Sequence, residues 1–221
     1  MEQLYFTEEH KMLQDMVRDF ARNEVKPLAQ ELDEKGGFPH ESVKKMAELG
    51  LMGIPWAEKY GGTGMDTLAL VIVIEELAKV CPSTGATIMA HTSLGTAPIA
   101  MFGTEEQKEK YLPGLASGHK IGAFGLTEPS AGSDAGNTQT KAVLDGDEYI
   151  VNGEKAFCTN AGVASVMIFT AVIVENGDEK GLVEFFGKQG WRKSVSEIGG
   201  KEFIKAFDEI KEAKKKVKVK S

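Results

Sequence analysis

The sequence predicts an α+β fold, with an N-terminal α-helical domain, a small β-barrel-like domain after it, and a short C-terminal helix. Two observations support this prediction. Apolar residues recur every three to four positions up to about residue 118, and from about residue 119 they follow the two-residue period of strands. With 221 residues, of which 42% are apolar and 27% charged, the chain has a globular composition and enough length for two small cores.

The first helix is expected to begin at Thr7, an N-cap residue followed by two glutamates that suit the positive end of the helix dipole. A second helix is expected to open at Pro39 and to close at Gly50. In both helices apolar residues recur at helical spacing, which predicts a buried stripe. The stripe residues are Leu13, Met16, Val17, Phe20 and Val25 in the first helix, and Val43, Met46 and Leu49 in the second.

A third helix is expected after Asp66, which can cap it. Its residues are apolar almost all round, so we expect it to lie centrally in its domain. Another helical stretch covers about residues 84–102. Thr104 and Gln107 then have the spacing of a capping box, which predicts a last helix that ends near Gly118.

The strand pattern follows and continues to about residue 186. The segments with a two-residue period are 120–127, 138–144, 148–152, 156–159 and 165–174. Asp145-Gly146 predicts a hairpin between two of them, and Asn176-Gly177 predicts another turn. We therefore divide the chain into a helical domain (1–118), a shortened β domain (119–198) and a lysine-rich helical tail (199–221).

The charge and the termini restrict the class of protein. The 26 Lys and Arg against 33 Asp and Glu give a net charge of −7, which argues against nucleic acid or a membrane surface as a partner. No signal peptide and no apolar run of about 18 residues is evident. The two cysteines, Cys81 and Cys158, do not form a disulfide framework. These features together predict a cytoplasmic protein.

The segment 123–136 is the most informative for chemistry. It leads from a strand into a loop of small residues, Ala131-Gly132-Ser133-Asp134-Ala135-Gly136. Such a loop lets backbone N–H groups approach a diphosphate or a ring edge. The alternative is a structural connection between strands, and composition alone favours that alternative.

The second informative segment is 152–160. If it is a strand, Phe157 and Thr159 share one face and Cys158 lies on the other. An aromatic plane beside a hydroxyl suits a flat heteroaromatic ring, whereas the alternative is a strand with Phe157 in the core. Cys158 has no histidine nearby in the sequence, so we interpret it as a small buried apolar residue and not as a nucleophile. The four histidines lack metal-ligand spacing, so no metal site is expected.

Several motifs in order closely resemble the acyl-CoA dehydrogenases, over about residues 4–174. They are Tyr60-Gly61-Gly62-Thr63-Gly64, the segments 102–108, 124–136 and 150–155, and Thr159-Asn160. Members of that family have an N-terminal helical domain, a middle β domain and a C-terminal four-helix domain. They bind FAD and oxidise acyl-CoA thioesters to 2-enoyl-CoA in fatty acid metabolism. The resemblance therefore implies a flavoprotein oxidoreductase with an acyl-CoA substrate and an electron-transferring flavoprotein as partner, and it allows a homo-oligomer.

The resemblance also implies roles for individual residues. Leu126 and Thr127 would lie at the polar edge of the flavin, Phe157 would lie against the ring, and Thr159 would donate its hydroxyl near N5. Ser133 would in addition bind the CoA arm of the substrate. The full set of implied cofactor-binding residues is Phe124, Gly125, Leu126, Thr127, Ser133, Phe157, Cys158 and Thr159.

The match weakens after Val174, and the C-terminal domain of the family is expected to be missing. In the family that domain carries the catalytic glutamate, part of the FAD site and most tetramer contacts. No acid of this chain matches the base by position, so we assign no catalytic residue. Glu128 and Asp134 belong to the loop and are expected to be structural.

Three functions therefore compete. The first is an acyl-CoA dehydrogenase represented by a shortened chain. The second is a non-catalytic module that binds flavin or CoA, and the third is an interaction fragment of that family. A flavin spectrum separates the third from the others, and turnover of an acyl-CoA separates the first from the second.

Overall fold

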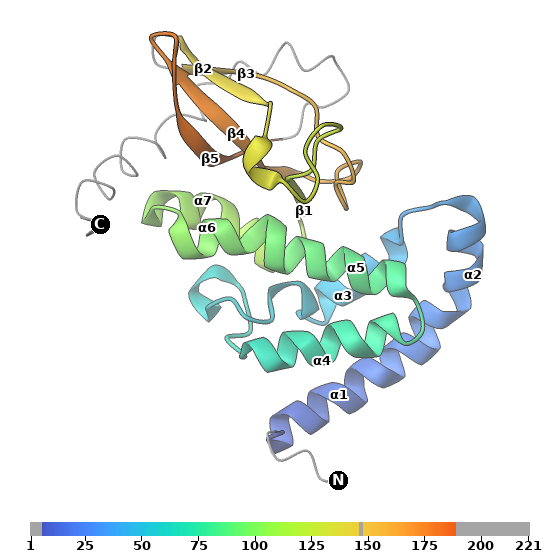
Figure 1. Ribbon diagram of the computed structural model, residues 1–221. Coiled ribbons are helices and arrows are strands. Elements are labelled where there is room, and N and C mark those ends of the chain that lie inside the picture. Colours follow the sequence, from blue (N-terminus) through green and yellow to red (C-terminus); the bar gives the residue numbers. More distant parts are fainter. Residues whose placement is uncertain (1–5, 146–147, 189–221) are drawn as a thin grey trace.

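The computed structural model describes residues 6–145 and 148–188, and it confirms the α+β fold (Figure 1). Helices occupy the chain up to Ala116, and the first strand begins at Gly122. The predicted C-terminal helix and the boundary at residue 198 lie outside the described residues. The domain limits stay a prediction. The α-helices are α1 (Glu8–Phe20), α2 (Lys26–Lys35), α3 (His40–Glu48), α4 (Thr67–Ala78), α5 (Pro82–Met89), α6 (Ala97–Phe102) and α7 (Glu105–Ala116).

Local capping chemistry starts three of the helices where the sequence predicts. The side chains of Thr7, Asp66 and Thr104 each accept a hydrogen bond from a backbone N–H in the first turn of α1, α4 and α7. Thr7 and Thr104 are the N-caps of full capping boxes, in which His10 and Gln107 accept the N–H of the cap residue in return. His10 Nε2 also lies 3.0 Å from Asp66 Oδ1, so one side chain joins the starts of α1 and α4.

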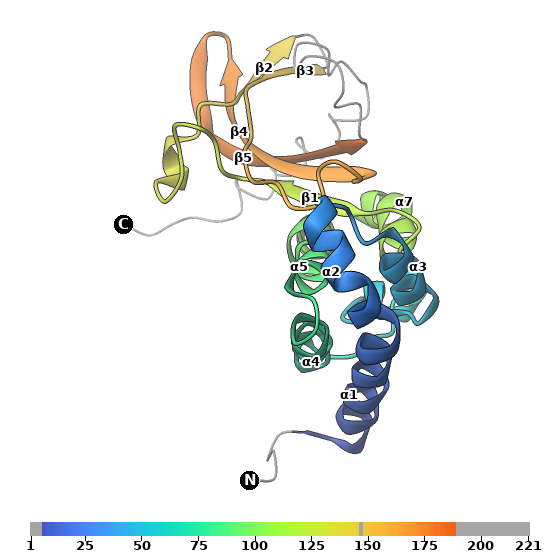
Figure 2. The ribbon, with the colours of Figure 1, turned by 90° about the vertical axis from the view of Figure 1, so that its right-hand side faces the viewer.

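Two predicted core residues, and the predicted central place of one helix, are wrong in detail. Met16 is 37% exposed, because Leu13 and Val17 form the buried stripe of α1. Leu49 is 44% exposed, because α3 ends at Glu48 and the chain turns away through Gly50 at φ 73°. α4 is not enclosed on all sides. It packs against α1 and α5, and its outer face, which carries the half-exposed Val71, forms one side of the helical layer (Figure 2).

The strands form one curved sheet around a long central strand (Figure 2). One edge of β4 pairs in parallel first with β1 and further along with β2, while β5 runs antiparallel along its other edge. The predicted hairpin joins β2 to β3, with Asp145 opposite Glu148. The predicted turn at Asn176 and Gly177 joins β4 to β5, and both residues have positive φ, as a two-residue hairpin requires. The bounds are β1 (Gly122–Gly125), β2 (Lys141–Asp145), β3 (Glu148–Asn152), β4 (Val166–Glu175) and β5 (Asp178–Lys188).

Residues 156–159 form a loop, so the prediction of a strand there is wrong. Phe157 has a φ of 55° and Asn160 a φ of 68°, both far from the extended backbone of a strand. The backbone N–H of Ala156 donates to the carbonyl of Thr127 at 2.8 Å, which turns the chain toward the end of β1. Long-range contacts therefore override the local strand pattern.

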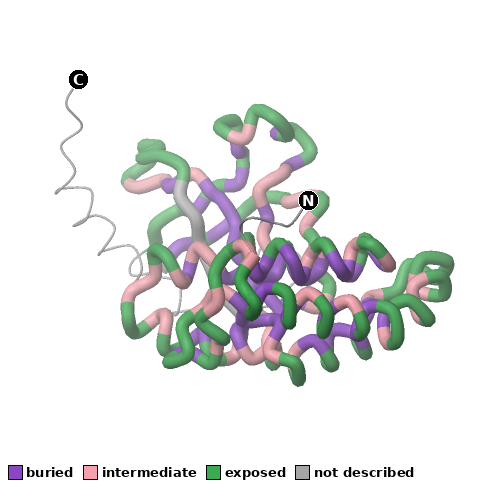
Figure 3. The backbone as a smooth tube through the Cα atoms, turned by 90° about the horizontal axis from the view of Figure 1, so that it is seen from below, coloured by how far each residue is buried: buried purple, intermediate pink, exposed green. Residues whose placement is uncertain are grey.

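The helices and the sheet share a buried contact that fixes their relative position. Tyr111, Leu112 and Leu115 of α7 pack with Val166 and Ile168 of β4 in one apolar cluster. Two further clusters fill the interior of the helical layer and one face of the sheet. Seen from below, buried residues line the inner sides of the helices and exposed residues their outer turns (Figure 3). Within the described ranges, no helix is long and apolar enough to cross a membrane.

Candidate functional site

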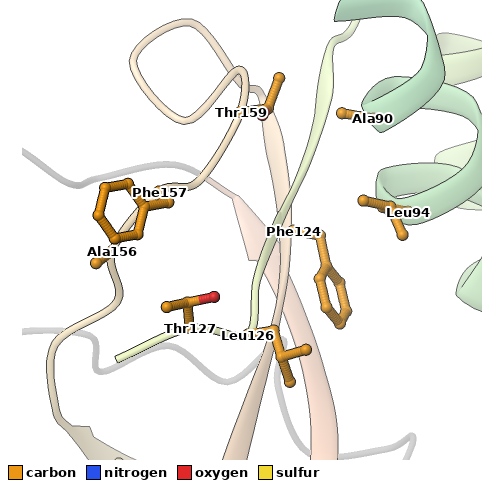
Figure 4. A pocket seen from close by; sticks show the side chains of 8 residues that line it. All are labelled: Ala90, Leu94, Phe124, Leu126, Thr127, Ala156, Phe157 and Thr159. Carbon is orange, nitrogen blue, oxygen red and sulfur yellow. The ribbon is translucent and has the colours of Figure 1, made fainter. Parts of the chain in front are cut away.

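A pocket of about 240 Å³ lies where the helices meet the sheet. Ala90 and Leu94 project into it from the helical side, toward the strand that carries Phe124 (Figure 4). The rest of the lining comes from the end of β1 and from the 156–159 loop. These residues are Phe124, Leu126, Thr127, Ala156, Phe157 and Thr159.

Two glycines allow the helical wall to reach the strand. Gly95 lies in a π-helical segment, Ala90–Thr96, between α5 and α6. A Cβ atom at Gly95 would lie 2.5 Å from the backbone carbon of Gly122, so only glycine allows this approach. The contact brings Leu94 beside Phe124 and thereby forms one wall of the pocket.

His91 holds this junction from inside. Its side chain is fully buried, Nδ1 accepts the N–H of Gly122 at 2.9 Å, and Nε2 lies 3.1 Å from the carbonyl oxygen of Leu115. These partners match the neutral tautomer with the proton on Nε2. Burial lowers the pKa of His91 to about 4, so the ring is neutral at pH 7. The histidine thus joins the π-helical segment to β1 and to α7.

Asn160 anchors the loop that forms the second wall. It is buried with a φ of 68°, and its Nδ2 donates to the carbonyls of Thr87 at 2.9 Å and Gly122 at 3.2 Å. Asparagine tolerates this left-handed conformation better than most residues. The anchor holds the adjacent Thr159 at the pocket.

Phe157 stands out as an exposed aromatic residue on an unusual backbone. It is 94% exposed and has a φ of 55°, although its ring borders an apolar pocket. Exposure of so large an apolar surface on a left-handed backbone is unfavourable for the chain alone. The arrangement suits a ligand with a flat apolar surface.

A buried ion pair lies next to two segments that line the pocket, since Lys155 precedes Ala156 and also donates to the carbonyl of Leu126. Lys155 Nζ lies 2.6 Å from Glu128 Oε1, and their side chains are 6% and 3% exposed. Desolvation by itself would raise the pKa of Glu128. Hydrogen bonds from Lys155, from Thr140 and from the backbone N–H of Gln139 outweigh it and lower that pKa to about 2. Glu128 is therefore a structural carboxylate, as the sequence predicts, and not a poised base.

The structure brings five of the eight predicted cofactor residues to the pocket: Phe124, Leu126, Thr127, Phe157 and Thr159. The other three lie outside its lining. Gly125 faces Met167 and the stem of Lys155, Cys158 packs against the core of the sheet, and Ser133 is on the exposed loop. Desolvation raises the pKa of the Cys158 thiol, which disfavours a nucleophilic thiolate. The ligand-binding roles of all eight stay a prediction.

Four residues of the site were not predicted from the sequence: Ala90, Leu94 and Ala156 of the lining, and His91 at the junction behind it. Ala90 and Leu94 are four residues apart and share a helical face, but their segment is more than 25 residues from the strand that they approach. The signal that could have found them is Gly95, because a glycine inside a helical pattern often marks a close backbone approach. In the part of the chain that the structure describes, no cluster of His, Cys, Asp and Glu could hold a metal ion.

Comparison with known proteins agrees with this architecture. Residues 7–119 match the family model described as "Acyl-CoA dehydrogenase, N-terminal domain", and residues 123–192 match "Acyl-CoA dehydrogenase, middle domain". The chain is 53% identical over 177 residues to a probable acyl-CoA dehydrogenase of Bacillus subtilis, YngJ, covering 80% of this chain and 47% of that protein. It is 50% identical over 201 residues to the short-chain specific acyl-CoA dehydrogenase of Clostridium acetobutylicum, covering 90% and 53%.

A solved structure shares the fold. The acyl-CoA dehydrogenase of Bacillus anthracis, complexed with FAD, superposes with a TM-score of 0.77 at 37% identity, covering 87% of this chain and 33% of that one. The chain spans about half the length of the curated relatives that it matches.

Proposed function

Because this chain belongs to the acyl-CoA dehydrogenase family, we propose that its pocket holds the flavin ring of FAD and serves the oxidation of an acyl-CoA thioester to the 2-enoyl-CoA. The observation that carries this proposal is Phe157, which is 94% exposed beside an apolar pocket and fits a flat ring laid against it. Bound FAD would supply the acceptor for the β-hydride of the substrate.

The residues of the pocket divide between packing and polar contacts. Leu94, Phe124 and Leu126 offer apolar surface that excludes water from the ring. Thr127 and Thr159 supply the hydroxyl groups of the lining, and Thr159 is proposed to donate toward N5. Ser133, on the exposed loop, is proposed to contact the CoA arm of the substrate, together with its cofactor role.

The described residues lack a base in the site. None of the eight lining residues is ionisable, and Glu128 is held in its ion pair. Loss of a positioned general base typically costs about 10²–10⁴-fold in rate. We therefore propose that this chain by itself binds FAD weakly and turns over slowly or not at all, and that a complete site needs further residues of the kind found in the longer relatives.

The same observation favours a second candidate, a non-catalytic module that binds flavin or CoA. A pocket without ionisable groups can hold the ring but cannot remove the α-proton of a thioester. An acyl-CoA and an electron-transferring flavoprotein are the proposed partners of the enzyme, whereas the module would bind its ligand without turnover.

The test combines FAD binding with turnover. Purified chain is dialysed and titrated with FAD by absorbance, and turnover is then followed with a short-chain acyl-CoA and an artificial electron acceptor, because one relative is short-chain specific. Phe157→Ser should weaken FAD binding without loss of folding stability, because the ring is exposed. Phe102→Ser is the matched control, since Phe102 is 75% exposed and lies outside the pocket lining. Equal FAD affinity in all three proteins, or no binding by any, contradicts the proposal.

A further inference from the structure

We propose that Lys155 is a positioning residue that locks the two walls of the pocket together before any ligand binds. These two walls both lie opposite the helical side that carries Leu94. One is the peptide segment of Leu126 and Thr127 after β1, and the other is that of Ala156 and Phe157. This inference deepens the proposed function, and its flavin measurement rests on that function.

The ammonium group of Lys155 joins three separate parts of the chain. Nζ donates to the carbonyl of Leu126 at 3.1 Å, to Glu128 Oε1 at 2.6 Å and to Thr170 Oγ1 at 3.0 Å. These acceptors belong to the end of β1, to the loop that follows and to β4. An ammonium has three protons, so this buried group has a partner for each of them.

Glu128 extends the link to the start of β2. Its Oε1 accepts the Thr140 hydroxyl at 2.6 Å and the Thr140 N–H at 3.1 Å, and its Oε2 accepts the Gln139 N–H at 2.6 Å. The carboxylate therefore stays hydrogen-bonded if Lys155 is replaced. The carbonyl of Leu126, in contrast, loses the donor that the structure gives it.

The bonds at Lys155 and at the next residue cross between the walls in the same direction, with both donors on the 155–156 segment and both acceptors on the 126–127 segment. Lys155 donates to the carbonyl of Leu126, and the Ala156 N–H donates to the carbonyl of Thr127 at 2.8 Å. The stem of Lys155 also covers Gly125, where a Cβ atom would lie 3.1 Å from Lys155 Cγ. Leu126, Thr127, Ala156 and Phe157 all line the pocket, so this clamp sets the spacing of its walls.

The alternative role for Lys155 is charge compensation alone, in which it only neutralises the buried Glu128. A pair of variants separates the two roles. Lys155→Met removes the donor to Leu126 and leaves the carboxylate without its counter-ion. The double variant Lys155→Met/Glu128→Gln removes the uncompensated charge as well, but it does not restore the donor to Leu126. Arg18→Met is the control for loss of a buried ion pair outside the site, because Arg18 pairs with the 2%-exposed Glu76 between α1 and α4, and neither residue lines the pocket. Glu76 keeps Lys79 as a second partner.

FAD affinity and urea midpoints are measured for the full chain and these variants under conditions in which each is folded. We expect Lys155→Met to lower the urea midpoint and to weaken FAD binding about tenfold, from the lost hydrogen bonds of a charged donor. The double variant should regain part of the midpoint, because it lacks the uncompensated charge but turns its amide NH2 group toward a backbone N–H, while FAD binding stays about tenfold weak. Arg18→Met should lower the midpoint and leave FAD affinity unchanged. If the double variant regains wild-type affinity along with stability, Lys155 only compensates charge and the proposal is overturned.

Amide hydrogen exchange at Ala156 tests the clamp without a ligand. In the double variant this N–H should exchange about tenfold faster than in Arg18→Met, because the clamp has lost one of its two bonds. Wild-type protection of Ala156 in the double variant overturns the proposal. If wild-type chain binds no FAD, the proposed function fails, and the exchange result still decides whether Lys155 holds the walls. If Lys155→Met alone does not fold, the double variant carries both comparisons.

Discussion

His91 is predicted to make the folded protein sensitive to mild acid. Its ring is fully buried and neutral, with Gly122 and Leu115 as backbone partners, and burial lowers its pKa to about 4. In the unfolded chain the pKa of a histidine is about 6.5. The unfolded chain therefore takes up a proton below about pH 6.5, whereas the folded chain does so only below about pH 4. The stability that His91 contributes is complete above pH 6.5 and is lost as the pH falls toward 4.

The magnitude follows from these two pKa values. Between about pH 7.5 and pH 5, the difference in proton binding lowers the free energy of unfolding by about 2 kcal/mol. Urea unfolding followed by circular dichroism at both pH values measures this loss. At the higher pH, His91→Gln should be less stable than wild type, because it disturbs two buried hydrogen bonds. Between the two pH values, however, the variant should not lose the free energy of about 2 kcal/mol that His91 accounts for.

His119→Gln is the matched control, because His119 is exposed and should leave the acid-induced loss unchanged. If His91→Gln loses as much free energy between the two pH values as wild type does, His91 is not the titrating group. The burial of His91 would then not explain the acid-induced loss of stability.

Three further outcomes are expected. Gly95→Ala should destabilise the chain by about 1–3 kcal/mol, because the added Cβ atom overpacks against Gly122. Gly132→Ala is the control, since a Cβ atom there meets nothing within 4 Å. Equal urea midpoints for the two variants would contradict the close approach of Gly95 to Gly122. Thr159→Val should lower the reduction potential of bound flavin by a few tens of millivolts, with little change in stability, because it removes one hydrogen bond and a two-electron couple shifts by about 30 mV per 1.4 kcal/mol. An unchanged potential would contradict the proposed contact between Thr159 and N5. Glu128 should contribute to the free energy of unfolding above about pH 4.5 and lose that contribution toward pH 2, because its pKa in the folded chain is lowered to about 2. Glu128→Gln should lack this acid-induced loss of stability, and a variant that still shows it would assign the loss to other groups.

Local chemistry made much of the fold predictable. Thr7, Asp66 and Thr104 start their helices because a side-chain oxygen satisfies N–H groups within the next three residues. Asn176 and Gly177 form the predicted turn because both tolerate a positive φ. Such interactions depend on neighbours in the sequence, so they can be read without knowledge of distant contacts.

The pocket depends on neighbours in space, and it could be predicted only in part. The ordered motifs of the family led to Phe124, Leu126, Thr127, Phe157 and Thr159, which the structure brings together. The physical pattern by itself predicted a strand at 156–159, where hydrogen bonds from Ala156 and Asn160 to other segments impose a loop.

By itself, the sequence determined the α+β class, the starts of three helices, two turns and the family resemblance, because these follow from residue order and local bonding. Only the tertiary structure decided that Ala90 and Leu94 complete the pocket, that His91 is sealed between helix and strand, and that Lys155 bridges three segments. Burial and long-range hydrogen bonds set these features. Both depend on which segments meet in space, and no local pattern specifies that.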